Sequence, residues 1–413
     1  MEHSKGILAV SLAMLALTGL AHGDDIDLYT FPAPPYQIVD DIPGPDAYVQ
    51  GLTVETMRCA ATRTGRQSRV HAAPPKRAVQ FLVTNLIDGY FAVDPSTALD
   101  QVAFRTHPVS LEKWYLVSRA DNEASENPRI GAIMGSNEEA WLRLQGKQVF
   151  LTVRTADQLI GLLKRRRIDQ ALMDQRVLES LNNTTDLASH FLRYVPLYAY
   201  FSRSFVSKNP GYIDEFNRQI PHCINGSFDL DETETVQIRS IAYDIFRELE
   251  ARIPLLAAIT DGPDIKSLSE ILNLDAQWQA LAPQHYSELA RRVADQPASI
   301  AMDKWQQGRE SLVTEVMLTN SIGTLVAMSR LTSDFWQGDE PKFERHIRSE
   351  TRNLYVSPIR YDASTTRFQV TVSMPVIVEG QWLPAGVLVI GLDVEQALKG
   401  AHHIRYLTDV MAE

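Results

Sequence analysis

The stretch SRVHAAPPKRAVQFLVTNLIDGYFAV, residues 68–93, indicates the fold class of the first half of the chain. It contains a short apolar run, then a segment with helical spacing that begins at two prolines, then a second apolar run. Proline is tolerated at the start of a helix because its missing N–H has no helical partner there. The order strand, helix, strand predicts a mostly parallel sheet with covering helices.

The same alternation extends on both sides of this stretch. Upstream, the sequence predicts a strand at 26–29, a Pro-rich loop that displays Tyr36, and a helix that Gly65 stops. Downstream, strands and helices repeat in outline, which predicts two β/α modules joined by crossings near 117–122 and 198–202. Modules of this kind place ligands in the crevice beyond the carboxyl ends of their strands.

The pattern changes after residue 226. The segment DLDETE, residues 229–234, opens a long amphipathic helix. Its acids lack the spacing and the glycine of a calcium loop, so we interpret them as helix-start charges. From Leu312 the apolar period shortens, and RFQVTVSMPVIV (367–378) and AGVLVIGLDV (385–394) are rich in β-branched residues. The second half is therefore predicted to be α+β, with an antiparallel sheet and long leading helices.

The composition is that of a soluble globular protein with two or three domains. The chain has 413 residues, of which 45% are hydrophobic and 22% charged. Its formal net charge of −11 disfavours nucleic acid and anionic membrane surfaces as partners. No metal-ligand spacing, nucleophile motif or phosphate-binding loop is found, so neither a cofactor nor an enzymatic activity is expected.

The N-terminus predicts export. Lys5 precedes an apolar run at 7–20, and a small-x-small sequence follows, which together indicate a signal peptide cleaved after Gly23. The expected location is therefore the periplasm. Two cysteines, Cys59 and Cys223, would stand in that oxidising compartment, either paired with each other or both as buried thiols.

The region 24–226 resembles the type 2 periplasmic solute-binding proteins of the amino-acid-binding kind. The resemblance rests on five stretches in their order: PPY (34–36), PPKRAVQFLVTNLIDG (74–89), IGAIMGS (130–136), RRIDQALMD (166–174) and FSRSFVSKNPGYIDEFN (201–217). It implies a bilobed α/β fold with two parallel or mixed sheets and a second lobe at about 122–198. The lobes of that family close on a small solute by hinge motion.

The resemblance also implies solute contacts. Tyr36 would pack on the solute, Arg77 would be the basic residue at the first-lobe helix start, and Ser136 would belong to the second-lobe anion loop. Asp174 matches the carboxylate that pairs with an α-amino group. From the residues alone, Asp174 fits equally well as the N-cap of the helix that follows it.

One position departs from the pattern of that family. Thr97 lies near the start of the Thr-x-x-Arg motif, whose arginine clamps the solute carboxylate. Here the arginine position is Asp100. We therefore include both among the ligand-binding residues, with two alternatives left open: a different solute, for example a cationic one, or a cleft that no longer binds.

The region 227–413 resembles the Cache domains, which are PAS-like extracellular sensors that bind small metabolites between a sheet and a lid. The matching stretches are NLDAQW (273–278), LVTEVMLTNSIGTLVAMS (312–329), TSDFWQGDE (332–340) and GVLVIGLDV (386–394). Thr332 or Ser333 is expected to cap a helix running towards residues 346–350, with Phe335 and Trp336 packing that helix on the sheet. Trp336 and Tyr361, the latter between strands, are the expected ligand contacts of this half.

These expectations define one main hypothesis and three alternatives. The main hypothesis is a non-enzymatic periplasmic protein that binds a small polar metabolite and passes its ligand state to a separate membrane receptor or transporter. The alternatives are the substrate-binding component of an importer, an interaction scaffold whose solute cleft has lost binding, and a lyase using Asp100 and Asp174 as an acid-base pair.

Overall fold

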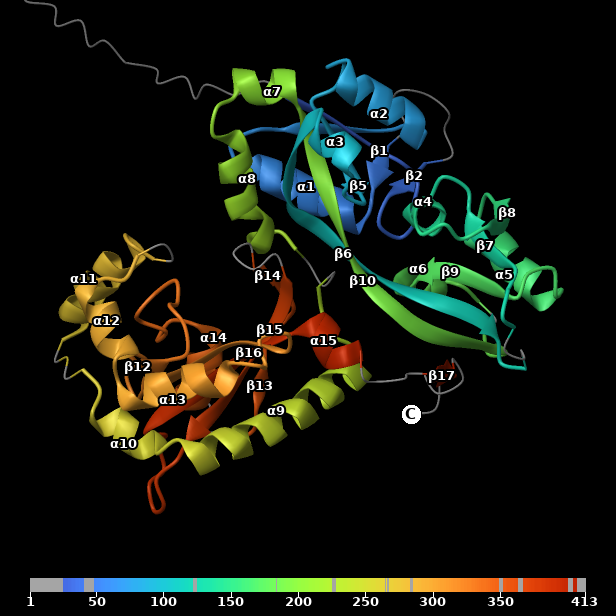
Figure 1. Ribbon diagram of the computed structural model, residues 1–413. Coiled ribbons are helices and arrows are strands. Elements are labelled where there is room, and N and C mark those ends of the chain that lie inside the picture. The colour runs from blue at the N-terminus through green and yellow to red at the C-terminus, as the bar shows by residue number, and fades with distance from the viewer. Residues whose placement is uncertain are drawn as a thin grey trace, which may run out of the picture.

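The computed structural model describes residues 25–40, 48–121, 125–182, 184–224, 228–263, 265, 267–282, 285–348, 352–362, 367–399 and 404–406. The predicted signal peptide lies outside these residues. The described chain forms a mixed α/β module followed by a module built on a separate antiparallel sheet (Figure 1). The expectation of an α/β first half and the expectation of an antiparallel sheet in the second half are therefore both confirmed. Among the helices of the described residues, none is both long and apolar enough to cross a bilayer.

The first module has a nine-stranded mixed sheet in the order β4-β1-β5-β10-β6-β9-β7-β8, with β17 also paired to β10. Its strands are β1 (Ile26–Thr30), β4 (Ser68–Ala72), β5 (Gly89–Val93), β6 (Ala103–Arg119), β7 (Ile130–Ile133), β8 (Val149–Val153), β9 (Gln170–Asp174), β10 (Leu187–Ser202) and β17 (Ile404–Tyr406). A small separate pair joins β2 (Ile38–Val39) to β3 (Val49–Gln50).

The helices of this module follow the predicted order. They are α1 (Leu52–Arg63), α2 (Pro75–Val83), α3 (Thr97–Asp100), α4 (Asn137–Leu144), α5 (Ala156–Lys164), α6 (Gln175–Glu179), α7 (Arg203–Lys208), α8 (Tyr212–Gln219) and the 3-10 turn η1 (Ile220–His222). Proline opens α2 as expected, and side-chain oxygens of Ser96, Ser136, Thr155, Asp174 and Ser202 cap α3, α4, α5, α6 and α7.

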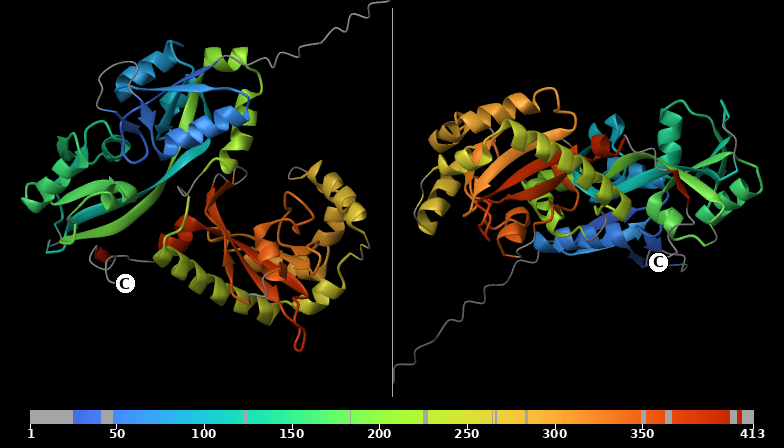
Figure 2. Two further views of the ribbon diagram at one scale, coloured as in Figure 1. Left: turned by 180° about the vertical axis from the view of Figure 1, so that it is seen from behind. Right: turned by 90° about the horizontal axis from the view of Figure 1, so that it is seen from below.

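Two long strands replace the predicted short crossings. β6 and β10 have 17 and 16 residues and pair with each other along their length, so that one continuous sheet runs through both lobes (Figures 1 and 2). The expectation of two sheets was wrong in this respect. In the first lobe β5 pairs with β10 at 198–201, and in the second lobe β9 pairs with β6 at 114–118. The stretch of β6 and β10 between these pairings connects the two lobes and is referred to below as the hinge.

The second module has a six-stranded antiparallel sheet in the order β12-β11-β16-β15-β13, with β14 on β15. Its strands are β11 (Val313–Asn320), β12 (Leu325–Met328), β13 (Tyr355–Val356), β14 (Arg360–Asp362), β15 (Arg367–Val376) and β16 (Gly386–Asp393). Its helices are α9 (Glu232–Arg252), α10 (Leu255–Thr260), α11 (Leu268–Gln279), α12 (Glu288–Ala294), α13 (Pro297–Gln306), α14 (Pro341–Arg348) and α15 (Val394–Lys399).

Helices cover both faces of this sheet. The apolar face of α9, including Ile238 and Phe246, packs with Val316 and Ile390 on one side. On the other side Trp278, Phe335 and Phe343 pack with Met317 and Val389. The acids at the start of α9 act as predicted, since Asp231 and Glu234 form a capping box. Figure 1 shows α9 lying along the sheet as one long helix.

The two cysteines are bonded to each other. Cys59 on α1 and Cys223 after η1 form a disulfide across a sequence separation of 164 residues. Of the two alternatives that the sequence left open, the structure has the paired one. The bond fixes the end of the first module to its first long helix, a few residues before the chain continues into α9.

Candidate functional site

Tyr36 and Asp174 meet at the junction of the two lobes. The Tyr36 hydroxyl donates a hydrogen bond to Asp174 Oδ1 at 3.0 Å. Tyr36 is only 2% exposed, so the expectation that its loop displays it was wrong. A hydrogen-bonded hydroxyl lets the ring lie inside the protein, which the flanking prolines did not indicate.

The Asp174 carboxylate is already fully engaged. It ends β9 and caps α6, accepting the backbone N–H groups of Arg176 and Val177 at 2.8 and 3.3 Å. Its second oxygen accepts the backbone N–H of Lys113 at 3.0 Å. With the Tyr36 hydroxyl the two oxygens receive four hydrogen bonds, which is close to the capacity of a carboxylate. The capping role of Asp174 is thus present, and a solute would have to displace existing bonds.

Asn137, next to Ser136, forms a second contact between the lobes. Ser136 caps α4 by accepting the backbone N–H of Glu139 at 3.2 Å. The Asn137 amide donates to the backbone oxygen of Ala92, in the first lobe, at 3.2 Å. Ala92 has φ 65°, a conformation that side-chain-bearing residues rarely adopt and that is often associated with functional sites.

The other predicted first-module residues lie on α2 and α3 of the first lobe. Arg77 is exposed on α2, and Thr97 is exposed at the start of α3. Asp100 accepts a hydrogen bond from the Tyr200 hydroxyl at 2.9 Å and lies 3.5 Å from Arg105. The hydrogen bonds and ion pairs among the described residues join none of the three to Tyr36 or Asp174. Asp100 and Asp174 are thus each bonded to partners of their own.

Two further buried carboxyl groups, Glu112 and Glu138, lie near Asp174, and no sequence pattern indicated them. Burial raises the pKa of Glu112 well above its usual range, and the nearby charges of Glu138 and Asp174 add to this effect. Burial likewise raises the pKa of Glu138 to about 7. The Trp114 indole donates to Glu112 at 2.8 Å and opposes part of the shift. The lobe junction therefore favours the protonated, uncharged form of these two carboxyl groups.

The raised pKa of Glu138 predicts that stability falls with rising pH. The folded protein holds a proton on Glu138 up to about pH 7, whereas the unfolded chain loses it near pH 4.5. Its stabilising protonation is therefore complete below pH 4.5 and lost between pH 4.5 and 7. We expect Glu138→Gln to match the wild type in urea unfolding at pH 4.5 and to exceed it by on the order of 2 kcal/mol at pH 8. If the variant and the wild type were equally stable at both pH values, the raised pKa of Glu138 would be contradicted.

A cavity of about 620 Å³ lies against the second sheet. Strands β11, β14 and β15 supply its floor, and the segment 330–342 with Tyr286 supplies the rest of its wall. The described residues that line it are Tyr286, Thr314, Glu315, Met317, Arg330, Leu331, Thr332, Ser333, Asp334, Gln337, Glu340, Lys342, Arg360, Asp362, Gln369 and Thr371. This volume is typical of a small-molecule site.

Charges of both signs surround this cavity. Burial raises the pKa of Glu315, whose carboxylate accepts no hydrogen bond from the described residues. Arg330 donates one N–H to the Thr314 backbone oxygen at 3.0 Å, and Lys342 pairs with Glu340 at 3.1 Å. The nearby charges of Lys342 and Arg330 lower the pKa of Glu315, against the larger effect of burial. The cavity can therefore offer a carboxylate and cations to one molecule.

The segment 332–340 is held in place from outside the cavity. Asp275 on α11 accepts the backbone N–H groups of Phe335 and Trp336 at 2.8 and 3.0 Å. The fully buried Phe335 ring packs against Trp278, with 5.5 Å between ring centroids. Gln337 is 1% exposed, and its amide oxygen has no hydrogen-bond partner among the described atoms. The segment thus presents fixed polar groups to the cavity.

Several expectations for this segment were wrong. Thr332 and Ser333 cap no helix, because both hydroxyls donate to Asp334 and α14 begins only at Pro341. Asp334 and Glu340 line the cavity, and Glu340 also directly precedes α14. The proline at the helix start explains the shorter helix, since it fixes the first turn at 341.

The two predicted aromatic contacts point elsewhere. Trp336 is not among the cavity-lining residues, and its indole donates to the Ile322 backbone oxygen at 2.9 Å. Tyr361 lies in β14 rather than between strands, with its ring near Phe368 and His107. Sequence reasoning missed Glu315, although a glutamate inside the apolar strand VTEVMLTN is an identifiable signal.

Comparisons with known proteins give partial matches to solved structures alone, since no family model and no curated protein matches the chain. One is an amino acid ABC transporter substrate-binding protein from Streptococcus pneumoniae bound to L-arginine (16% identity, TM-score 0.38, 48% of this chain and 88% of that chain). Another is the GluR0 ligand-binding core from Nostoc punctiforme with L-glutamate (17%, 0.39, 48% and 92%). A third is a histidine kinase sensor domain similar to periplasmic binding proteins (14%, 0.40, 48% and 89%).

Proposed function

We propose that this protein is a non-enzymatic, periplasmic small-molecule-binding and sensing protein. Its second module binds a small polar solute that carries an ammonium or guanidinium group together with a carboxylate. The ligand state passes to a separate membrane receptor or transporter. The observation that carries the proposal is the mixed-charge cavity on the second sheet. The export of the chain is inferred from its apolar N-terminal run.

The charge arrangement supports a solute with both charges. Glu315 is a carboxylate that burial makes costly to ionise, and an ammonium group would supply the missing hydrogen bonds and charge. Arg330 can reach a solute carboxylate with the guanidinium nitrogens that do not bond Thr314. The unpaired amide oxygen of Gln337 offers a further acceptor. A solute with only a positive charge would leave Arg330 without a carboxylate partner, and a solute with only a negative charge would leave Glu315 without a cation.

A thermal-shift panel tests this function. The exported protein is heated with three sets of compounds: amino acids and short peptides, amines without a carboxylate, and carboxylic acids without an amine. A binding compound at one hundred times its Kd stabilises the folded state by about 2.7 kcal/mol, which is readily measured. We expect the first set to contain the strongest stabilisers and Arg330→Met to abolish their effect. A panel in which no compound raises the Tm would overturn the proposal.

The lobe junction favours a different role for the first module, that of a scaffold without a solute. Asp174 receives four hydrogen bonds, and Asp100 replaces the expected arginine clamp. Arg77→Ala should then leave the affinity of every stabilising compound unchanged. A loss of affinity in this variant would favour a solute in the first-module cleft, as in an importer component. Co-purification with a transporter rather than a receptor would point the same way.

A further inference from the structure

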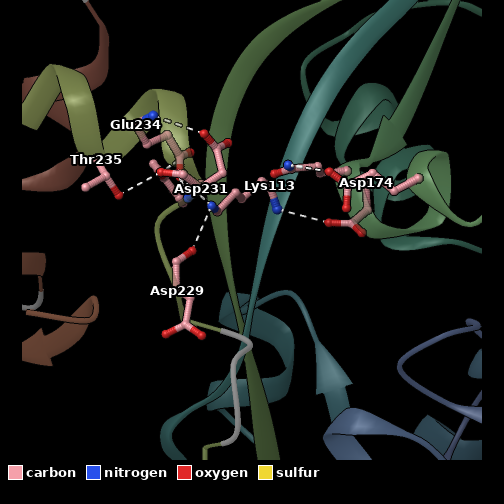
Figure 3. A network of polar contacts seen from close by, with 9 residues as sticks. Lys113, Asp174, Asp229, Asp231, Glu234 and Thr235 are labelled. Carbon is pink, nitrogen blue, oxygen red and sulfur yellow. Dashed lines mark hydrogen bonds and ion pairs between the residues drawn. The ribbon is translucent and has the colours of Figure 1, made fainter. Parts of the chain in front are cut away.

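Lys113 and Glu234 form a buried ion pair between the two modules. Lys113 Nζ lies 2.6 Å from Glu234 Oε2 and donates to the Asp229 backbone oxygen at 3.0 Å (Figure 3). The two side chains are only 10% and 6% exposed. The hydroxyl of Tyr194, which lies opposite Lys113 in the hinge, donates to the other Glu234 oxygen at 2.7 Å. Both hinge strands therefore contact the first turn of α9.

Lys113 also reaches the lobe junction through its backbone. Its N–H donates to Asp174, and Asp174 accepts the Tyr36 hydroxyl from the first lobe. Figure 3 shows Lys113 between Asp174 on one side and Glu234 on the other. One residue of the hinge thus bonds the carboxylate that joins the lobes and the helix that begins the second module.

On the far side, α9 leads to the sheet that carries the ligand cavity. Glu234 is part of the capping box that starts α9, so a displacement of its carboxylate acts on the helix end. Along its length α9 packs against the sheet, and Gln237 donates to the Ala397 backbone oxygen at 2.9 Å. α9 contacts β15, whose Gln369 and Thr371 line the cavity.

A small cavity gives this connection room to rearrange. It measures about 270 Å³ and is lined by Tyr36, Lys113, Asp174, Asp229 and Asp231, among others. Its walls come from the first lobe, the hinge, the second lobe and the segment before α9. Space beside a buried polar network permits the second arrangement that any switching element requires.

We propose that the contacts Tyr36–Asp174–Lys113–Glu234 couple the arrangement of the two lobes to the position of α9, and through α9 to the cavity on the second sheet. Opening of the lobes breaks the Tyr36–Asp174 bond and frees the hinge backbone at Lys113. The ion pair transmits this change to the first turn of α9. The inference rests on the proposed function only for the statement that the cavity on the second sheet binds a ligand. The mechanical link is independent of that ligand.

Hydrogen exchange without any solute tests the link. Tyr36→Phe removes the hydroxyl at the lobe junction, and Tyr90→Phe is the matched control. Tyr90 also belongs to the first module, and its buried hydroxyl has no hydrogen-bond partner among the described atoms. We expect Tyr36→Phe to speed amide exchange at residues 232–240 at least fivefold, and Tyr90→Phe to leave it unchanged. A change confined to α6, or an equal change in both variants, overturns the proposal.

The ion pair itself is tested in a second background. Replacing both charges, as Lys113→Met with Glu234→Gln, leaves neither buried charge alone, and the glutamine keeps a side-chain oxygen for the capping box of α9. In that background Tyr36→Phe should no longer alter amide exchange at residues 232–240. The ring contact between His107 of the first module and Tyr361 of the second remains, so the two modules still touch. Lys113→Arg keeps the positive charge beside Glu234, so this single replacement leaves no buried charge alone. In the Lys113→Arg background, Tyr36→Phe should still speed amide exchange at residues 232–240. Persistence of the effect without the ion pair would refute its role. The hydrogen-exchange experiments contain no solute. A thermal-shift panel without any binding compound would therefore overturn the proposed function and leave the coupling proposed here intact.

Discussion

Replacing Cys59 and Cys223 together by alanine is expected to lower the free energy of unfolding by about 2–5 kcal/mol. The disulfide closes a loop with a sequence separation of 164 residues, so it removes many conformations from the unfolded chain. Cys223 is 1% exposed within the first-module core, so small cavities add to the loss. The measurement is urea unfolding of the oxidised wild type and the double variant.

Reductant distinguishes the bond from the packing. Dithiothreitol should shift the urea midpoint of the wild type towards that of the variant and leave the variant itself unchanged. The part of the loss that remains between the reduced wild type and the variant measures the cavities. A wild-type midpoint that does not respond to complete reduction would show that the bond contributes nothing. The bond also fixes the chain where it leaves the first module, so its loss should loosen the start of α9.

The two long strands β6 and β10 show which parts of the fold local sequence patterns could predict and which they could not. The alternation around 68–93 is local and was predicted correctly, as was the antiparallel sheet of the second module. β6 and β10 were underestimated because each contains an internal proline, Pro108 and Pro196, which normally argues against a central strand. Pro108 pairs with Tyr198 where the register of these strands shifts. A bulge at that point accommodates a residue that the regular ladder would exclude.

The candidate site depends on contacts that no local pattern specifies. Asp174 fits a ligand carboxylate and an N-cap equally well, and only its four donors decide between them. Glu315, Arg330 and Lys342 come from a strand, a loop and a helix start, and the fold alone brings them to one cavity. The segment TSDFWQGDE lies against the cavity, and Asp334 and Glu340 rather than Trp336 line it.

Glu315→Gln is expected to make the protein more stable without solute and to weaken solute binding tenfold to a hundredfold. Burial raises the pKa of Glu315, so its ionised form at neutral pH costs stability that a neutral amide of the same shape does not. The same carboxylate is the proposed partner of a solute ammonium group. Its loss removes a hydrogen bond to a charged group, which corresponds to about 1.4–2.8 kcal/mol.

Two measurements separate these effects. The Tm without solute should rise in Glu315→Gln, whereas the Tm gain caused by an amino acid from the panel should shrink. Glu55→Gln is the matched control, because Glu55 is an exposed acid on α1 in the other module. It removes the same charge and should leave the Tm gain unchanged, and because Glu55 lies in the first turn of α1 the Tm without solute should not rise. A lower Tm of Glu315→Gln without solute would mean that the carboxylate has a structural partner instead.

The pH dependence of binding gives a further check on the same residue. Only ionised Glu315 can pair with an ammonium group, so wild-type affinity should rise as the pH increases through the raised pKa of Glu315 and then level off. Binding of the cation would itself lower that pKa, so proton release should accompany binding on the acidic side. In Glu315→Gln the affinity should be nearly independent of pH over the same interval. Calorimetry in two buffers of different ionisation enthalpy measures the released proton directly, and an unchanged pH profile in the variant would assign the ammonium site to Asp334 or Glu340.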